Sequence, residues 1–193
     1  MDVDAFWALV ESARSDVDGQ VDDEALATRL TRVSPEEIVG FQVRFDRTCD
    51  ALHRWDVQAA AYLIGGGCSD DAFTDFRAGV VGLGREWYER VLGSPDDLAG
   101  HPVVRRAAAE GDDEALFAES LAYAAGEAYA QVTGDEEAFH AALEALAEAA
   151  AGPGEAADLG EDLDLDDEDE MRRRLPRLAE LFLGPGDDGP GVG

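Results

Sequence analysis

Apolar residues recur every three or four positions along most of the chain, which is the period of an amphipathic α-helix. The clearest stripe runs through Ile38, Phe41, Phe45, Cys49 and Leu52. The alternation of apolar and polar residues that is typical of a half-buried strand is missing from the sequence. The pattern therefore predicts an all-α protein, and the period of the clearest stripe places Cys49 in the core.

Helix-start signals divide the chain into helices. Ser34 precedes Pro35, and Glu37 stands three residues after the serine, as a capping box requires. Ser94 stands before another proline in the same way. From such signals we expect about seven to nine helices, packed into a single compact domain over residues 1–151.

Two stretches in the second half of this domain carry specific expectations. Asp112, Asp113 and Glu114 predict the start of a long alanine-rich helix that ends near Gly134. The stretch around His101, just before this helix, is predicted to be a short connection.

The composition changes after residue 151. Gly152–Gly154 includes a proline and predicts a domain boundary, followed by a flexible acidic linker over residues 152–170. A short amphipathic helix is expected within 171–183, and a disordered tail over 184–193. Two roles stay open for the apolar face of this helix: it docks onto its own domain, or it presents the face to another protein.

Charge limits the kinds of partner. The chain of 193 residues has a formal net charge of −29 at pH 7, and all its cationic side chains except histidine are arginines. Such acidity repels nucleic acid and anionic membranes, so we expect neither as a partner. Three explanations of the acidity stay open: a solvated surface, a docking face for a basic protein partner, or a mimic of nucleic acid.

The sequence predicts a cytoplasmic protein. Its first residues, Met1-Asp2-Val3-Asp4, are acidic where a signal peptide would be basic. No apolar stretch approaches the roughly 20 residues that span a bilayer. Cys49 and Cys68 are too few for a disulfide framework, so both thiols are expected to be reduced.

The candidate site is a corner between two predicted helices. Three consecutive glycines, Gly65–Gly67, end one helix, and Ser69 is placed to cap the next. A helix N-terminus lowers the pKa of a thiol, but neighbouring carboxylates disfavour the thiolate. Asp71 and Asp75 share a helix face, so they could bind a divalent cation together with Asp70. The candidate binding residues are Gly67, Cys68, Ser69, Asp70, Asp71, Asp75 and Arg77.

Two interpretations of the corner stay open. In the first, Ser69 caps the helix and Arg77 forms an ion pair with a neighbouring carboxylate, so the corner is structural. The function we favour is a non-enzymatic interaction or regulatory protein that engages a protein partner through its acidic surface or through the groove beside Ser69–Arg77. The alternative is a small enzyme or a divalent-metal-binding protein that uses Cys68, Asp70, Asp71, Asp75 and Arg77. We expect no cofactor, and we assign no catalytic residue and no metal ligand.

The corner also resembles a known family. Gly66–Asp71, with Phe73, Phe76 and Arg77, is similar to the uncharacterised bacterial family called domain of unknown function 4240. The resemblance covers about residues 4–99. The family has no established chemistry, so the resemblance implies membership and no particular activity.

Two further details belong to this resemblance. The family pattern has a large aromatic residue two positions after the arginine, where this chain has Gly79, so one hydrophobic anchor is missing or replaced. The string from Asp169 to Leu178 is similar to the endings of actinobacterial members, so we expect a member of the actinobacterial type.

Overall fold

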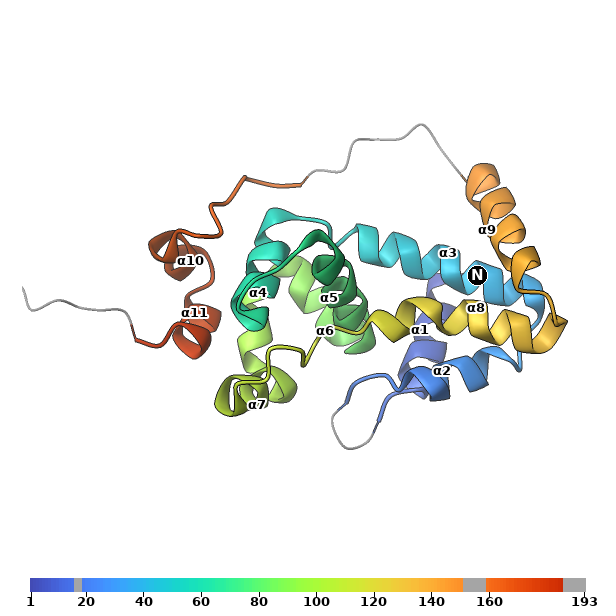
Figure 1. Ribbon diagram of the computed structural model, residues 1–193, viewed down its shortest axis with the longest axis horizontal. Coiled ribbons are helices and arrows are strands. Elements are labelled where there is room, and N and C mark those ends of the chain that lie inside the picture. The colour runs from blue at the N-terminus through green and yellow to red at the C-terminus, as the bar shows by residue number, and fades with distance from the viewer. Residues whose placement is uncertain (16–18, 151–158, 186–193) are drawn as a thin grey trace, which may run out of the picture.

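The computed structural model describes residues 1–15, 19–150 and 159–185, which form an elongated array of helices (Figure 1). Within these ranges there is no β-strand, and an isolated bridge joins Arg14 to Val21. The predicted all-α class is therefore confirmed. The helices are α1 (Val3–Ser12), α2 (Asp23–Leu30), α3 (Pro35–Asp50), α4 (Trp55–Gly65), α5 (Asp70–Gly82), α6 (Arg85–Gly93), the 3-10 helix η1 (Pro95–Gly100), α7 (Pro102–Glu110), α8 (Glu119–Thr133), α9 (Glu136–Ala150), α10 (Glu168–Arg174) and α11 (Pro176–Phe182).

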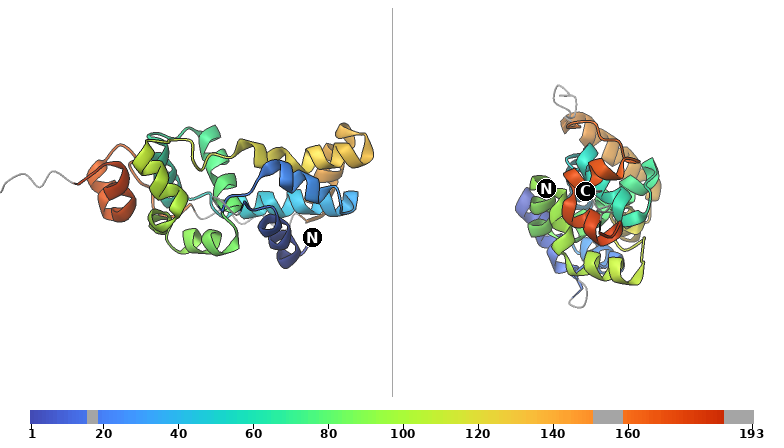
Figure 2. Two further views of the ribbon diagram at one scale, coloured as in Figure 1. Left: turned by 90° about the horizontal axis from the view of Figure 1, so that it is seen from below. Right: turned by 90° about the vertical axis from the view of Figure 1, so that its left-hand side faces the viewer.

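The helices are arranged along the long axis of the molecule. Helices α1, α2, α3, α8 and α9 lie at one end, α10 and α11 lie at the other, and α4–α7 lie between them (Figures 1 and 2). Helix α8 packs against α2, α3 and α5. Its buried residues include Ala124, Ala125 and Ala128, whose small side chains let the neighbouring helices approach closely. Phe6 and Phe41 are fully buried in the same core, with ring centroids 5.0 Å apart.

Helix α3 has the local structure that its sequence predicts. Ser34 Oγ accepts a hydrogen bond from the Glu37 N–H, and the Glu37 carboxylate accepts one from the Ser34 N–H, so the capping box is present. The apolar stripe that follows is buried, and Cys49 is 9% exposed. Burial raises the pKa of Cys49 to about 12. Cys49 is therefore a core residue, as predicted.

The described residues contain twelve helical elements, more than the predicted seven to nine. One additional helix arises because Pro176 separates α10 from α11. The residue before a proline avoids the α-helical conformation, and Leu175 accordingly has φ −130° and ψ 60°.

A second additional helix, α7, occupies the stretch around His101 that was predicted to be a connection. Nδ1 of His101 accepts a hydrogen bond from the Val103 N–H at 3.2 Å and so caps the helix. Burial first, and the charge of Arg14 second, lower the pKa of His101 to about 4. The imidazole therefore stays neutral and can accept. The prediction of a connection was wrong: Pro102 at the first helical position was the available signal, and the burial that keeps the His101 cap neutral is a tertiary property.

Helix α8 begins at Glu119, so the helix start predicted at Asp112 is also wrong. Residues 112–118 instead run against α5 as irregular chain, and the Ala118 N–H donates to the Asp75 carbonyl at 3.1 Å. A Cβ atom at Gly79 would lie only 1.8 Å from the carbonyl oxygen of Leu116. The glycine therefore permits this approach, and the side chain of Leu116 is buried in the core.

Residues 159–185, the C-terminal segment, pack at the far end of the molecule (Figure 1). Their first contact is a hydrogen bond from the Trp55 N–H to the Leu159 carbonyl at 3.0 Å. Residues 152–158 of the predicted linker and 186–193 of the predicted tail lie outside the described residues. The division into domain, linker, helix and tail therefore stays a prediction.

Candidate functional site

The corner between α4 and α5 is built from glycines and a serine cap. Gly66 ends α4 in the left-handed region at φ 61°, and Gly67 follows at φ 144°. Both N–H groups donate to the carbonyl of Tyr62, in a turn whose backbone angles favour glycine. Ser69 Oγ then accepts a hydrogen bond from the Ala72 N–H at 3.2 Å. The glycine turn and the serine cap are therefore as predicted from the sequence.

The thiol of Cys68 is partly buried against the hydrophobic core. Its Sγ donates to the carbonyl of Ser69, 3.5 Å away. Burial, and then the charge of Asp70, raise the pKa of Cys68 to about 11. The thiol consequently stays protonated near neutral pH, which makes it a poor nucleophile.

Asp70 and Asp71 occupy the first turn of α5, and both are exposed. No described residue donates a hydrogen bond to either carboxylate. Their position beside the unpaired N–H groups of the helix is the one in which negative charge stabilises a helix.

Arg77 points away from these carboxylates. Its guanidinium lies over the ring of Phe73, 5.0 Å from the centroid, and its side chain is 11% exposed. Nη1 lies 3.4 Å from the carbonyl of Cys49 and 3.8 Å from Oδ1 of Asp50. Nη2 donates to the hydroxyl of Thr74. Arg77 therefore ties α5 to the C-terminal end of α3.

Asp75 lies on a different face of α5 and borders a hollow of about 450 Å³. Burial is the largest cause that raises the pKa of Asp75, followed by the charges of Glu119 and Asp71. None of the residues that line the hollow is cationic. We call this site the acidic hollow; its lining residues are Gly65, Gly67, Ala72, Asp75, Asp113, Glu114, Phe117 and Glu119.

The structure thus divides the predicted site. Gly67 and Asp75 line the acidic hollow, Cys68 and Arg77 face other neighbours, and Ser69, Asp70 and Asp71 form the start of α5. The sequence did not reveal that residues 113–119 form the opposite wall. Gly79 was the available signal, because a glycine inside a helix can mark the close approach of another chain segment. The lining residues that sequence reasoning missed are Asp113, Glu114, Phe117 and Glu119.

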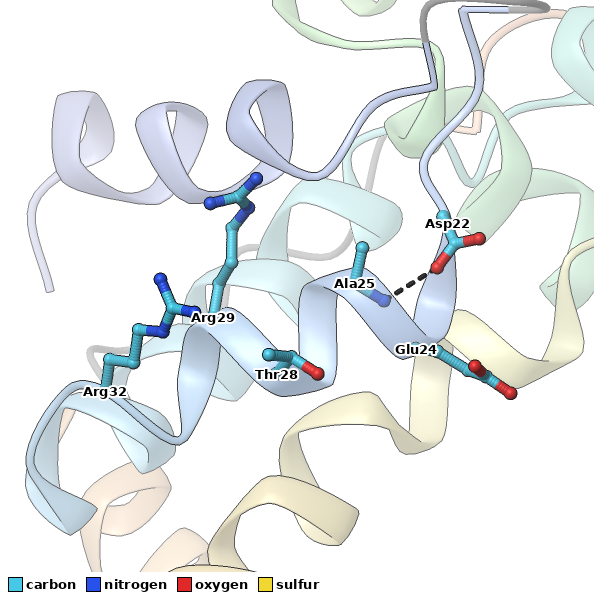
Figure 3. A pocket seen from close by; sticks show the side chains of 6 residues that line it. All are labelled: Asp22, Glu24, Ala25, Thr28, Arg29 and Arg32. Carbon is cyan, nitrogen blue, oxygen red and sulfur yellow. Dashed lines mark hydrogen bonds between the residues drawn. The ribbon is translucent and has the colours of Figure 1, made fainter.

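A second hollow, of about 290 Å³, lies on α2 and differs in charge (Figure 3). Arg29 extends from the C-terminal part of the helix and Arg32 from the turn that follows it, while Asp22 and Glu24 lie at the start of the helix (Figure 3). Asp22 is engaged as a cap, since its Oδ1 accepts from the Ala25 N–H at 2.7 Å. This hollow therefore carries charges of both signs, unlike the acidic hollow.

Two features are absent from the described ranges. No group of three or more His, Cys, Asp or Glu side chains in them is arranged to hold a metal ion. Asp70, Asp71 and Asp75 accordingly do not form such a group. None of the helices in these ranges combines the length and the apolar character needed to cross a bilayer.

Comparison with known proteins places the chain in a family. No curated protein and no solved structure matches it. Residues 1–131 match the family described as protein of unknown function (DUF4240), and these residues include the corner and all of the acidic hollow. The match covers more than half of the 193 residues. The chain therefore belongs to the DUF4240 family.

Proposed function

We propose that this protein is a non-enzymatic interaction or regulatory protein that binds a basic segment of a protein partner in the acidic hollow. We place it in the cytoplasm. We also propose that it is an actinobacterial-type member of its family, because residues 169–178 are similar to the endings of such members.

The observation that supports this function is the unbalanced charge of the acidic hollow. Asp75 is partly buried, and the charge of Glu119 helps to raise its pKa, while Arg77 is directed toward α3. A cation about 4 Å from a carboxylate gains about 1 kcal/mol in water and about 4 kcal/mol at an effective dielectric constant of 20. A cationic side chain in the hollow would therefore relieve an existing repulsion.

The shape of the hollow favours an arginine or lysine side chain. Its volume of about 450 Å³ can admit the end of one long side chain. The Phe117 ring and the Gly65 backbone supply apolar surface for the methylene groups of such a side chain. Asp75 and Glu119 then supply carboxylates for its charged end.

The enzymatic and metal-binding alternatives receive less support from the described residues. The pKa of Cys68 is raised to about 11, which is the wrong direction for a nucleophile. The side chains of Asp75 and Arg77 have different neighbours. We therefore base the proposal on the acidic hollow and not on the full set of corner residues.

The test measures binding of a fluorescein-labelled hexa-arginine peptide by fluorescence anisotropy. The hollow variant combines Asp75→Asn with Glu119→Gln. Its matched control combines Glu110→Gln with Glu127→Gln, which changes the net charge equally at exposed carboxylates outside the hollow. Circular dichroism establishes that each variant is folded.

We expect the hollow variant to bind the peptide about tenfold more weakly or worse, and the control to stay within about twofold. Equal losses in the two variants would show that the peptide responds to the general negative field of the surface. That result would overturn the assignment of the site. No binding by the unmodified protein at low salt would overturn the function itself.

A further inference from the structure

The C-terminal segment, residues 159–185, lies beyond the family match, which ends at residue 131. Its helix α11 packs against η1, α4 and α7, and α10 packs against α11. Figures 1 and 2 show both helices at one extremity of the molecule. We call the face that α11 covers, formed by η1, α4 and α7, the C-terminal groove.

Asp96 of η1 holds the first turn of α11. Its side chain is mostly buried, at 8% exposure for the residue. Oδ1 accepts hydrogen bonds from the N–H groups of Arg177 at 3.0 Å and Leu178 at 2.9 Å, and Oδ2 lies 3.2 Å from the Arg177 nitrogen. Helix α11 has no side-chain cap of its own. The groove therefore supplies the acceptor that the first turn of a helix lacks.

The groove also recognises side chains of the helix. Leu178 and Ala179 are completely buried, and Leu175 is 2% exposed. The guanidinium of Arg177 pairs with Asp97, the neighbour of Asp96, at 2.8 Å. The sequence that fits the groove is thus leucine, proline, a basic residue and leucine, with the proline starting the helix.

The second half of α11 does not fill the groove. A hollow of about 620 Å³ lies between this half and α7. Leu181 borders the hollow from α11, and it remains only partly buried. Small residues, including Ala108 and Ala109, line the opposite side, together with Arg105. A helix with larger apolar residues in its second turn would bury more surface there.

We propose that the C-terminal groove is a binding site for a short amphipathic helix of another protein, and that α11 occupies it as an intramolecular competitor. The partner helix begins with leucine, proline and a basic residue, and its N–H groups bind Asp96. Because α11 is covalently linked to the groove, its effective concentration there is on the order of millimolar, so a partner must bind more tightly than α11 or arrive when α11 is released. This site is separate from the acidic hollow.

The test starts from the full chain with a protease recognition sequence inserted between Gly152 and Gly154. After cleavage, a fluorescein-labelled peptide of residues 159–185 is added in excess, and anisotropy and native mass spectrometry follow its binding. We expect the peptide to replace the cleaved segment while the circular dichroism of the remaining protein is retained. The uncleaved chain should bind the peptide about 100-fold more weakly or worse, because its own segment competes.

Asp96→Ala is the variant that tests the mechanism. We expect it to weaken peptide binding to the cleaved protein by about 30-fold, the equivalent of losing hydrogen bonds to a charged group. Asp97→Asn is the matched control, since its ion pair with Arg177 is exposed, and it should weaken binding by no more than about fivefold. Equal effects of the two variants would overturn the role of Asp96.

Three other results would overturn the proposal. The cleaved segment could stay bound until urea unfolds the whole protein, which would make it an integral part of the fold. The remaining protein could unfold when the segment leaves, which would also make the segment an integral part of the fold. Sedimentation of the uncleaved chain could reveal a dimer that Asp96→Ala abolishes, and the occupant would then be a second copy of this chain.

Discussion

The acidic hollow and the C-terminal groove both contain an aspartate with a second acid nearby, but the two aspartates have different partners. In the groove, Asp96 accepts hydrogen bonds from the first turn of α11, and Asp97 pairs with Arg177. In the hollow, Asp75 shares the space with Glu119, and its pKa is raised.

This difference separates a carboxylate that stabilises the fold from one that does not. Asp96 satisfies N–H groups that would otherwise lack an acceptor, so it stabilises the folded chain. Asp75 is partly desolvated beside a like charge, so its ionised form destabilises the folded chain. A residue that costs stability and is nevertheless present is a candidate for function, because function can offset such a cost.

The largest effect is expected from Gly79→Ala, which breaks the acidic hollow. The new Cβ atom would lie 1.8 Å from the Leu116 carbonyl oxygen, so residues 112–118 must move away from α5. We expect a loss of about 3 kcal/mol of unfolding free energy or more, measured by urea denaturation. Gly93→Ala is the control, because nothing lies within 4 Å of its Cβ position, and it should change stability by about 0.5 kcal/mol or less. Similar losses of unfolding free energy in both variants would contradict the close approach of Leu116 to Gly79.

Asp96→Ala should produce the next largest effect, and it removes the acceptor of the C-terminal groove. Losing hydrogen bonds to a charged group is expected to cost about 2 kcal/mol. Hydrogen exchange should accelerate specifically in residues 176–182, since α11 loses its acceptor. Asp97→Asn should cost about 0.5 kcal/mol, because its ion pair is exposed. Unchanged exchange in α11 after Asp96→Ala would contradict the assigned role.

Ser69→Ala tests the serine cap at the start of α5. Removing the hydroxyl that accepts from Ala72 should lower the unfolding free energy by about 1 kcal/mol. Asp71→Asn should have a smaller effect, because its exposed carboxylate stabilises the helix end through charge alone and its repulsion of Asp75 offsets part of that stabilisation. Thermal and urea denaturation can rank the two variants. The opposite order would mean that Asp71 has a stronger partner than the structure shows.

The smallest effect has the opposite sign. Asp75→Asn should stabilise the protein by no more than about 0.5 kcal/mol at pH 7, because it removes a partly buried charge beside Glu119 that solvent still screens. The folded-state pKa of Asp75 lies above its unfolded value, so the penalty is complete above the folded pKa and vanishes below the ordinary value of about 4. The advantage of the variant should therefore shrink as the pH falls from 7 to 4.

The control for this prediction is Glu110→Gln, which removes an exposed acid outside the hollow. It should change stability little at either pH. Urea denaturation of the three proteins at pH 7 and pH 4 provides the measurement. A destabilised Asp75→Asn variant would show that Asp75 stabilises the folded chain, as Asp96 does in the C-terminal groove.

The sequence by itself determined the features that depend on neighbours within one or two helical turns. The 3.6-residue period predicted the all-α class and the burial of Cys49. Ser34 and Ser69 were identifiable as caps because a side-chain oxygen reaches an N–H group three residues later. The glycine turn before Cys68 was predictable for the same reason, since its backbone angles are a local requirement.

Tertiary structure decided the features that join distant parts of the chain. It turned Arg77 toward α3, brought Glu119 opposite Asp75, and made a cap of His101. It also placed Asp96 at the start of α11, 81 residues later in the chain. Helical periodicity shows which face of a helix is buried, but it does not show which segment covers that face. Packing therefore decides which carboxylates gain hydrogen-bond donors and which remain beside another acid.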